Sequence, residues 1–207
     1  MTAPRDAVVV VVDDDLSVRE ALDSLLRAAG LRCESHGSAA EFLLAPRPDA
    51  PTCLVLDVHL PGESGLDLLR AMRESGASIP VVFITGRATI PMSVQAMKLG
   101  AVEFLQKPFG ERELLAAIDH ALARDEAARA ARAEQRALGA LLDRLTPRER
   151  DVFRLVAAGR MSKEIATELG TALQTVKQQR SRVMQKLGVR SVAELVRLAE
   201  RGQPPPP

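Results

Sequence analysis

The sequence predicts an α/β domain with a doubly wound, five-stranded parallel sheet, joined by a long helix to an all-α domain of four helices. Through residue 122, short runs of branched apolar residues alternate with helical patterns. Glycine, proline and aspartate mark where these segments end. From residue 145 onward, only helical patterns remain. Strands that alternate with helices of ordinary length form parallel sheets with right-handed crossovers.

The elements of the first domain follow in a regular order. Five consecutive valines, residues 8–12, have the β-branched pattern of a strand buried on both faces. The helix after them begins near Ser17 and is stopped by Gly30. Further strands are predicted at residues 31–35, 54–57, 80–84 and 101–105, with helices at about residues 38–44, 65–74 and 91–99 between them.

Composition excludes several classes of protein. The 207 residues, 46% hydrophobic and 27% charged, fit a globular protein of one large or two small domains. Five Phe with no Tyr or Trp argue against a binder of single-stranded nucleic acid, because such binders stack bases on aromatic rings. The two cysteines lack metal-ligand spacing and indicate reduced thiols. The apolar run at residues 7–12 is too short to span a membrane, so a cytoplasmic protein without membrane contact is expected.

The net charge of +1 hides an asymmetry between the two halves. Residues 1–125 contain 12 Lys and Arg against 18 Asp and Glu, whereas residues 126–207 contain 16 against 9. An acidic first half and a basic second half indicate two domains with different partners. A basic domain favours a polyanionic partner.

Polar residues follow the predicted strands at the ends that a parallel sheet brings to one edge. Asp13 and Asp14 follow the first strand, Asp57 ends the third, Thr85 follows the fourth, and Lys107 follows the fifth. Clustered carboxylates resist ionising together unless a cation lies between them. Mg²⁺ prefers a few carboxylates, waters and a phosphate oxygen. The sequence therefore predicts a Mg²⁺ site at the edge where open α/β sheets bind ligands.

Residues 6–122 resemble the receiver domain of bacterial two-component response regulators. The order and spacing of the matched residues make this resemblance specific. They are the acidic pair Asp13 and Asp14, the single Asp57, the hydroxyl residue Thr85, Lys107 with the following Pro108, and Phe104 three residues before that lysine. The resemblance implies a flavodoxin-like fold and a cis bond between Lys107 and Pro108.

The resemblance assigns a role to each residue at this edge. Asp57 is the phosphoacceptor, which takes a phosphoryl group from a phosphohistidine on a cognate sensor histidine kinase. Asp13, Asp14, Asp57 and the backbone carbonyl of His59 are the expected Mg²⁺ ligands. The His59 imidazole is expected to be exposed and non-essential.

Three further residues are expected to contact or sense the phosphoryl group. Lys107 neutralises its oxygens, and Thr85 donates a hydrogen bond to it. In the family, inward movement of Thr85 is coupled to burial of the ring at Phe104. Phe104 stands where relatives often carry Tyr, and core packing is its alternative role.

A long helix is predicted from about Glu111. Residues 123–137 contain no large apolar side chain, only Ala with Arg, Asp, Glu and Gln, which is typical of an exposed connecting helix. The second domain begins with Thr146 as N-cap, Pro147 at the first helical position and Glu149 at the third. Ser162 is expected to cap the next, short helix, and a glycine turn then leads to a third helix, which indicates a helix-turn-helix.

Residues 142–202 resemble the DNA-binding domain of the LuxR, NarL and FixJ regulators. The matched motifs are Leu145-Thr146-Pro147-Arg148-Glu149, Lys163-Glu164-Ile165-Ala166, Thr175-Val176-Lys177 and Lys186-Leu187-Gly188-Val189. By helical geometry, one side of the third helix, residues 173–187, is polar and should face the major groove. Lys177, Gln178 and Ser181, with Gln174, are expected at or near base edges, and Thr175, Gln179, Arg182 and Lys163 at phosphates.

The recognition helix departs from the family pattern in two informative places. Ala172 and Leu173 replace the usual Ser-Pro start, so the N-cap hydroxyl is missing or displaced to Thr171. Arg180 falls within the apolar side of the helix, and we predict a structural role, with Glu149 or Glu164 as its partner. The fourth helix, with Val192, Leu195, Val196 and Leu198, is the dimer surface that the resemblance implies.

These observations predict a transcriptional response regulator and not an enzyme. Its partners would be a sensor histidine kinase, double-stranded DNA, a second copy of the chain when phosphorylated, and RNA polymerase. The expected divisions are a receiver at residues 1–122, a helical linker at 123–141, a DNA-binding domain at 142–203 and a disordered tail at 204–207. An aspartate-nucleophile phosphatase is the enzymatic alternative, although such enzymes carry a second acid where this chain has His59. A DNA-binding protein with a vestigial receiver is the third hypothesis.

Overall fold

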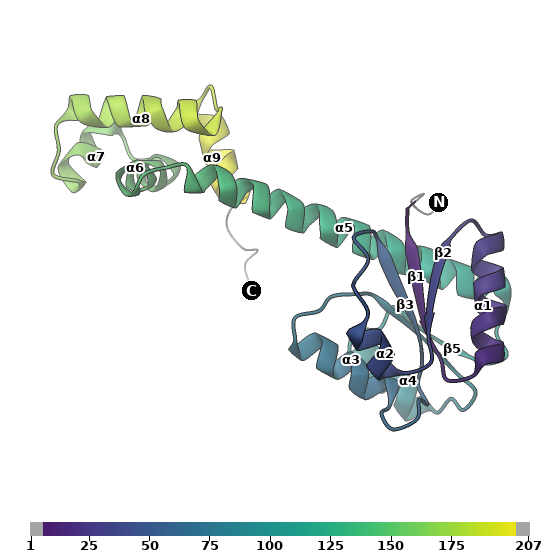
Figure 1. The fold of residues 1–207 in the computed structure, drawn as a ribbon. Helices are drawn as coiled ribbons and strands as arrows, with labels where there is room; N and C mark the ends of the chain where they lie inside the picture. The colour runs from purple at the N-terminus through teal and green to yellow at the C-terminus, as the bar shows by residue number, and fades with distance from the viewer. Residues whose placement is uncertain (1–5, 202–207) are drawn as a thin grey trace. The chain divides into compact units, whose positions relative to one another are not determined.

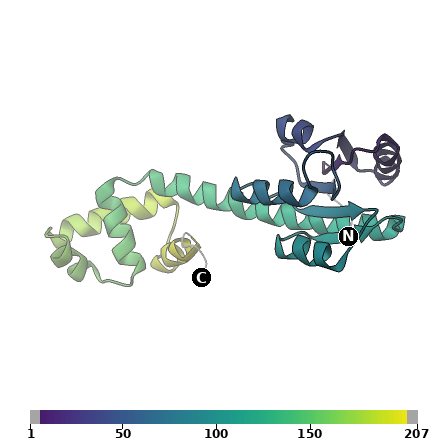
Figure 2. The same cartoon turned by 90° about the horizontal axis from the view of Figure 1, so that it is seen from below.

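The computed structural model describes residues 6–201, and the chain divides into two compact units, residues 1–129 and 130–207. Helix α5 (Glu111–Asp143) runs through this boundary without a break, as Figures 1 and 2 show. None of the helices within residues 6–201 combines the length and the apolar character that a membrane span requires. The predicted disordered tail at residues 204–207 lies outside the described residues.

The first unit contains a five-stranded sheet in the order β2-β1-β3-β4-β5, and all neighbouring strands are parallel. Every residue of β1, β3 and β4 is buried, which explains their continuous apolar sequences. The predicted fold class is therefore confirmed. The strands are β1 (Val8–Val12), β2 (Arg32–His36), β3 (Thr52–Asp57), β4 (Val81–Thr85) and β5 (Glu103–Gln106).

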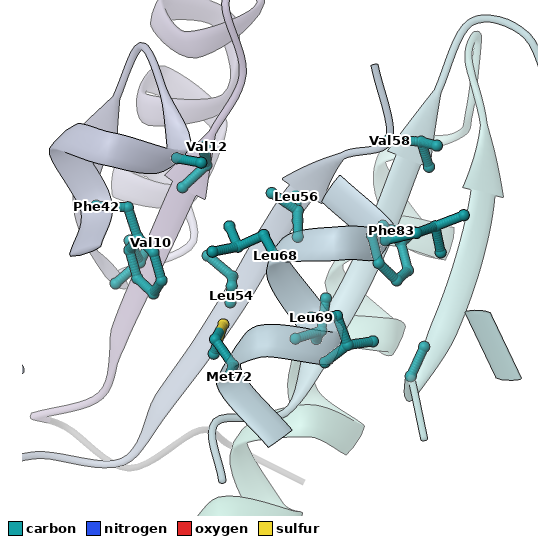
Figure 3. Packing of buried hydrophobic residues seen from close by; sticks show 14 of the residues in the cluster. Val10, Val12, Phe42, Leu54, Leu56, Val58, Leu68, Leu69, Met72 and Phe83 are labelled. Carbon is teal, nitrogen blue, oxygen red and sulfur yellow. The ribbon is translucent and has the colours of Figure 1, made fainter. Parts of the chain in front are cut away.

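Helices cover both faces of the sheet and enclose two separate cores. Alternate residues of β1 divide between them: Val8, Val10 and Val12 join the core beneath α2, α3 and α4, and Val9 and Val11 join the core beneath α1 and α5. Figure 3 shows Leu68, Leu69 and Met72 of α3 packed over the first of these cores. The remaining helices are α1 (Leu16–Ala28), α2 (Ala39–Leu44), α3 (Gly65–Glu74) and α4 (Ile90–Lys98).

Polar contacts join helix α5 to the rest of the first unit, in addition to the packing of its apolar face. Asp125 is only 4% exposed, and its Oδ2 accepts a 2.9 Å hydrogen bond from the backbone N–H of Thr52, the first residue of β3. Arg129 forms a 2.6 Å ion pair with the fully exposed Asp49, a geometry that contributes little in solvent. The composition of residues 123–137 did not predict the buried carboxylate.

The second unit is a helical bundle around one apolar core. Thr146 and Glu149 form the predicted capping box at the start of α6. The N-cap of α7 is Met161 and not Ser162, so that prediction is wrong; the Glu164 carboxylate instead accepts a hydrogen bond from the Met161 N–H. The helices of the second unit are α6 (Pro147–Ala157), α7 (Ser162–Glu168), α8 (Leu173–Leu187) and α9 (Val192–Arg201).

Helix α9 contributes mainly to this core. Leu195 is fully buried, and Val192 and Leu198 are half-buried and pack against the core. The prediction that these residues present a dimer surface is therefore wrong for Leu195. The resemblance implied a dimer surface here, but Leu195 lies inside the core of the second unit.

Candidate functional site

The carboxyl ends of the parallel strands bring the predicted site residues to one edge of the sheet. Asp13 follows β1, Asp57 and Thr85 end β3 and β4, and Lys107 follows β5. Asp13 and Thr85 are fully buried, and Asp57 is 7% exposed. Asp14 is exposed at the rim. The peptide bond between Lys107 and Pro108 is cis, as the resemblance implied.

Three carboxylates and one ammonium form the centre of this site. Carboxylate oxygens of Asp13, Asp14 and Asp57 all lie within 4.8 Å of one another. The Lys107 Nζ lies 2.6 Å from Asp13 Oδ2 and 2.8 Å from Asp57 Oδ2. The Lys107 ammonium thus pairs with two of the three carboxylates, which leaves the acidic cluster short of cationic charge.

The pKa values of Asp13 and Lys107 depend on burial and on the hydrogen bonds that Lys107 donates. Burial raises the pKa of Asp13 and outweighs the hydrogen bond that Lys107 donates to it. Burial would lower the pKa of Lys107, but hydrogen bonds to Asp13 and Asp57 reverse this effect and raise it. A divalent ion would relieve the remaining repulsion, and an all-oxygen donor set suits Mg²⁺. The residues therefore fit such an ion.

The turn after β3 is built around Asp57 by contacts that the sequence did not reveal. The backbone N–H of His59 donates a 2.8 Å hydrogen bond to Asp57 Oδ1. Gly65, the first residue of α3, lies so close that a Cβ there would come within 2.2 Å of the backbone oxygen of Asp57. Arg19 of α1 supports Asp13 from the other side, donating a 2.7 Å hydrogen bond to its backbone oxygen.

Thr85 and Phe104, the two residues with an expected switch role, contact different neighbours. The Thr85 hydroxyl lies 3.0 Å from His59 Nδ1 and accepts a 3.2 Å hydrogen bond from the Arg87 N–H. The His59 side chain is exposed, as expected, but its contact with Thr85 was not predicted. Phe104 is half-buried and meets Phe83 at a ring-centroid distance of 6.3 Å. Its ring packs on the sheet core, so it belongs to the hydrophobic structure as well.

In the second unit, the polar side of α8 is open to solvent. The opposite side of α8 is buried and carries Val176, Val183 and Leu187. Of the predicted DNA contacts, Thr175 and Gln179 are half-buried, and the Gln179 Oε1 is buried without a hydrogen-bond partner within residues 6–201. The exposed members of the set are Lys163, Gln174, Lys177, Gln178, Ser181 and Arg182.

Arg180 does not have the predicted acidic partner. Glu149 is 5% exposed and pairs with Lys186 at 2.6 Å, and hydrogen bonds from Lys186 and Thr146 lower its pKa. The Arg180 Nη1 instead donates a 3.4 Å hydrogen bond to the Ser162 hydroxyl, which links α8 to α7. The N-cap of α8 is Ala172, and it supplies no side-chain hydrogen bond to the start of this helix.

A parallel sheet with an acidic edge, followed by a helix-turn-helix, defines a signal-receiving DNA-binding protein. Residues 9–119 match the family model "response regulator receiver domain", and residues 143–199 match "bacterial regulatory proteins, luxR family". The two matches together cover most of the chain.

Similarity to curated and solved relatives also extends over nearly the whole chain. Nodulation protein W of Bradyrhizobium diazoefficiens is 48% identical over 96% of this chain and 87% of its own. The transcriptional regulatory protein FixJ of Azorhizobium caulinodans is 40% identical over 95% and 93%. The solved structure of the response regulator StyR is 49% identical, covers 95% of this chain and 99% of its own, and superposes with a TM-score of 0.86.

The chain belongs to the response regulators that join a receiver domain to a LuxR-type helix-turn-helix, the family of FixJ, NodW and TodT. It is a two-component transcriptional regulator, activated through phosphorylation of its receiver, and not a classical enzyme. The receiver implies a kinase as partner, and the helix-turn-helix implies DNA. The acidic triad is of the type that binds Mg²⁺.

Proposed function

We propose that Asp57 is the phosphoacceptor and that its modification drives dimerisation and promoter binding. The observation that carries this is the Lys107 ammonium, held 2.8 Å from Asp57 Oδ2 at the end of a buried strand. In the transfer, an Asp57 oxygen forms a bond to phosphorus while the bond from phosphorus to the kinase histidine nitrogen breaks. Lys107 is placed to neutralise the phosphoryl oxygens, since positioning and charge neutralisation are what such transfers require.

Asp13, Asp14, Asp57 and the backbone carbonyl of His59 would hold Mg²⁺. The ion would supply charge neutralisation for the entering phosphoryl group. Asp13 is buried and fixed by Arg19 and Lys107, so it offers a rigid ligand. Asp14 is exposed and free to adjust.

Once Asp57 is phosphorylated, Thr85 would move inward and donate a hydrogen bond to the phosphoryl group. The ring of Phe104 would become buried as Thr85 moves. A new dianionic group orders a donor that reaches it. This change would alter the surface of α4, where Ile90 is 81%, Val94 47% and Met97 49% exposed. These three recur every three or four residues and form one apolar stripe, so we assign a dimer contact of the phosphorylated receiver to α4.

Helix α8 would enter the major groove. Lys177, Gln178 and Ser181, with Gln174, are proposed to reach base edges, because they share the exposed side of the helix. Contacts to phosphates would position this helix without specifying sequence. We assign those to Lys163, Thr175, Gln179 and Arg182. A dimer would read two half-sites about one helical turn apart. We also propose domain boundaries at residues 122, 141 and 203. A cytoplasmic location and contact with RNA polymerase are the remaining parts of the proposal.

The test is incubation of the full chain with acetyl phosphate and Mg²⁺. Wild type should gain the mass of one phosphoryl group, dimerise by light scattering, and bind more tightly to a duplex selected from random DNA. Asp57→Asn should do none of these. Asp67→Asn, which removes an exposed carboxylate of α3, is the matched control and should behave as wild type. A mass gain without a change in dimerisation or DNA affinity would favour the vestigial-receiver hypothesis.

A further inference from the structure

One residue beside the acceptor contacts both Asp57 and Thr85. The main chain of His59 binds Asp57 Oδ1 through its N–H at 2.8 Å. The ring of the same residue binds the Thr85 hydroxyl through Nδ1 at 3.0 Å. The acceptor carboxylate and the switch hydroxyl are thus linked through a single residue, by its main chain on one side and its ring on the other.

The Thr85 hydroxyl has only one proton to donate. Its oxygen already accepts a hydrogen bond from the Arg87 N–H at 3.2 Å. When Nδ1 carries no proton, the hydroxyl must donate its proton to His59. When Nδ1 carries one, it donates to the hydroxyl and fixes the same Thr85 rotamer. In both tautomers, the imidazole holds the Thr85 hydroxyl beside His59.

We propose that His59 is a positioning residue for the switch: its imidazole holds the Thr85 hydroxyl in the inactive arrangement and must release it when Asp57 is phosphorylated. This rests on the proposed roles of Asp57 and Thr85. When Nδ1 carries no proton, a phosphoryl group on Asp57 competes with His59 for the hydroxyl proton. When Nδ1 carries one, the phosphoryl group must draw the Thr85 hydroxyl away from it, so in both tautomers each interaction weakens the other. The contact thereby opposes activation in the unmodified chain.

Burial distinguishes this role from a structural one. Thr85 is fully buried at the end of β4, whereas the His59 side chain is exposed. An exposed imidazole adds little to the core, so its removal should spare the fold. A neutral hydrogen bond contributes little net free energy, and the expected shift in the switch is about 3- to 10-fold, which is about 0.6–1.4 kcal/mol.

The experiment compares His59→Ala with wild type in DNA affinity, without phosphodonor and at equal phosphoryl occupancy determined by mass. The probe is the selected duplex used above. The unmodified variant should bind about 3- to 10-fold more tightly than unmodified wild type, and the phosphorylated forms should bind alike. His120→Ala, an exposed histidine of α5, is the matched control and should change neither value.

A double-mutant cycle tests whether His59 acts through Thr85. In a Thr85→Val background, His59→Ala should have no further effect on the affinity of the unmodified chain. In wild type, the ¹⁵N resonance of His59 Nδ1 should shift on phosphorylation as the hydrogen bond is lost. Three results would each overturn the inference. They are an effect of His59→Ala that is undiminished in the Thr85→Val background, a His59 Nδ1 resonance that does not shift, and an unmodified His59→Ala chain that binds DNA as tightly as unmodified wild type. Failure of Asp57 itself to gain a phosphoryl group would instead contradict the proposed function.

Discussion

Replacing Lys107 with methionine should destabilise the receiver, because it leaves two buried carboxylates without their cation. The Lys107 Nζ donates hydrogen bonds of 2.6 Å and 2.8 Å to Asp13 and Asp57. Removing one partner of a buried ion pair costs about 3–5 kcal/mol. The Lys107 side chain is 22% exposed, and Asp13, whose pKa burial already raises, can relieve part of the cost by taking up a proton. We therefore expect a loss of about 2–3 kcal/mol in the free energy of unfolding.

Magnesium should reverse much of this loss. In wild type, the ion must share the carboxylates with the Lys107 ammonium, whereas in Lys107→Met they are free to bind it. Binding to the folded state stabilises it by about 2.7 kcal/mol when the ligand is at 100 times its Kd. The difference between wild type and variant should therefore narrow in excess Mg²⁺, even though both become more stable.

The assay is calorimetry of the full chain in EDTA and in Mg²⁺, since a protein with no Trp or Tyr gives little intrinsic fluorescence signal. For a unit of this size, the expected loss corresponds to a fall in Tm of about 6–12 °C in EDTA. Lys98→Met, at the exposed end of α4, is the matched control and should shift Tm little. An equal difference between wild type and Lys107→Met in EDTA and in Mg²⁺ would refute the reasoning.

Three other predictions concern separate parts of the chain. Gly65→Ala should destabilise the receiver by about 1–3 kcal/mol and slow phosphorylation, because its Cβ would meet backbone beside the acceptor; urea unfolding and mass gain measure the two effects. Glu149→Gln should lower the free energy of unfolding by about 1.5–3 kcal/mol at pH 7, because the hydrogen bond from Lys186 lowers the Glu149 pKa below its ordinary 4.5. When unfolding is measured against pH, this advantage of the wild type should shrink below pH 4.5 and disappear below the pKa of Glu149 in the folded state. Lys177→Ala should relax base preference in a selection from random DNA, whereas Lys163→Ala should weaken binding to all sequences and reduce its salt dependence.

The sheet and most of its acidic edge could be predicted because they depend on local patterns and one topological rule. Continuous apolar runs identified β1, β3 and β4, since strands buried on both faces have no polar alternation. The carboxyl ends of parallel strands share one edge, so Asp13, Asp57 and Lys107 could be grouped although they lie far apart in sequence. No comparable rule applied to side-chain partners.

The contacts that were missed depend on distances between elements. Helical angle placed Arg180 on the inner side of α8, but Lys186 and not Arg180 reaches Glu149. The pattern around Gly65 indicated a helix start, but not that backbone passes where a Cβ would lie. The proximity of the His59 ring to Thr85 depends on the path of the turn after β3, which sequence spacing does not define.

Asp125 shows what such a contact implies for signal transmission. It lies in the part of α5 that has no large apolar side chain, yet it is buried and bound to the first residue of β3. Asp57 is the last residue of that strand. Residues 111–125 of α5 therefore bind the sheet in two ways, through their apolar face and through a hydrogen bond at the start of β3. These contacts account for a first compact unit that extends to Arg129. Movement of β3 on modification of Asp57 would therefore be passed to α5 through this hydrogen bond as well as through the apolar core that the two elements share.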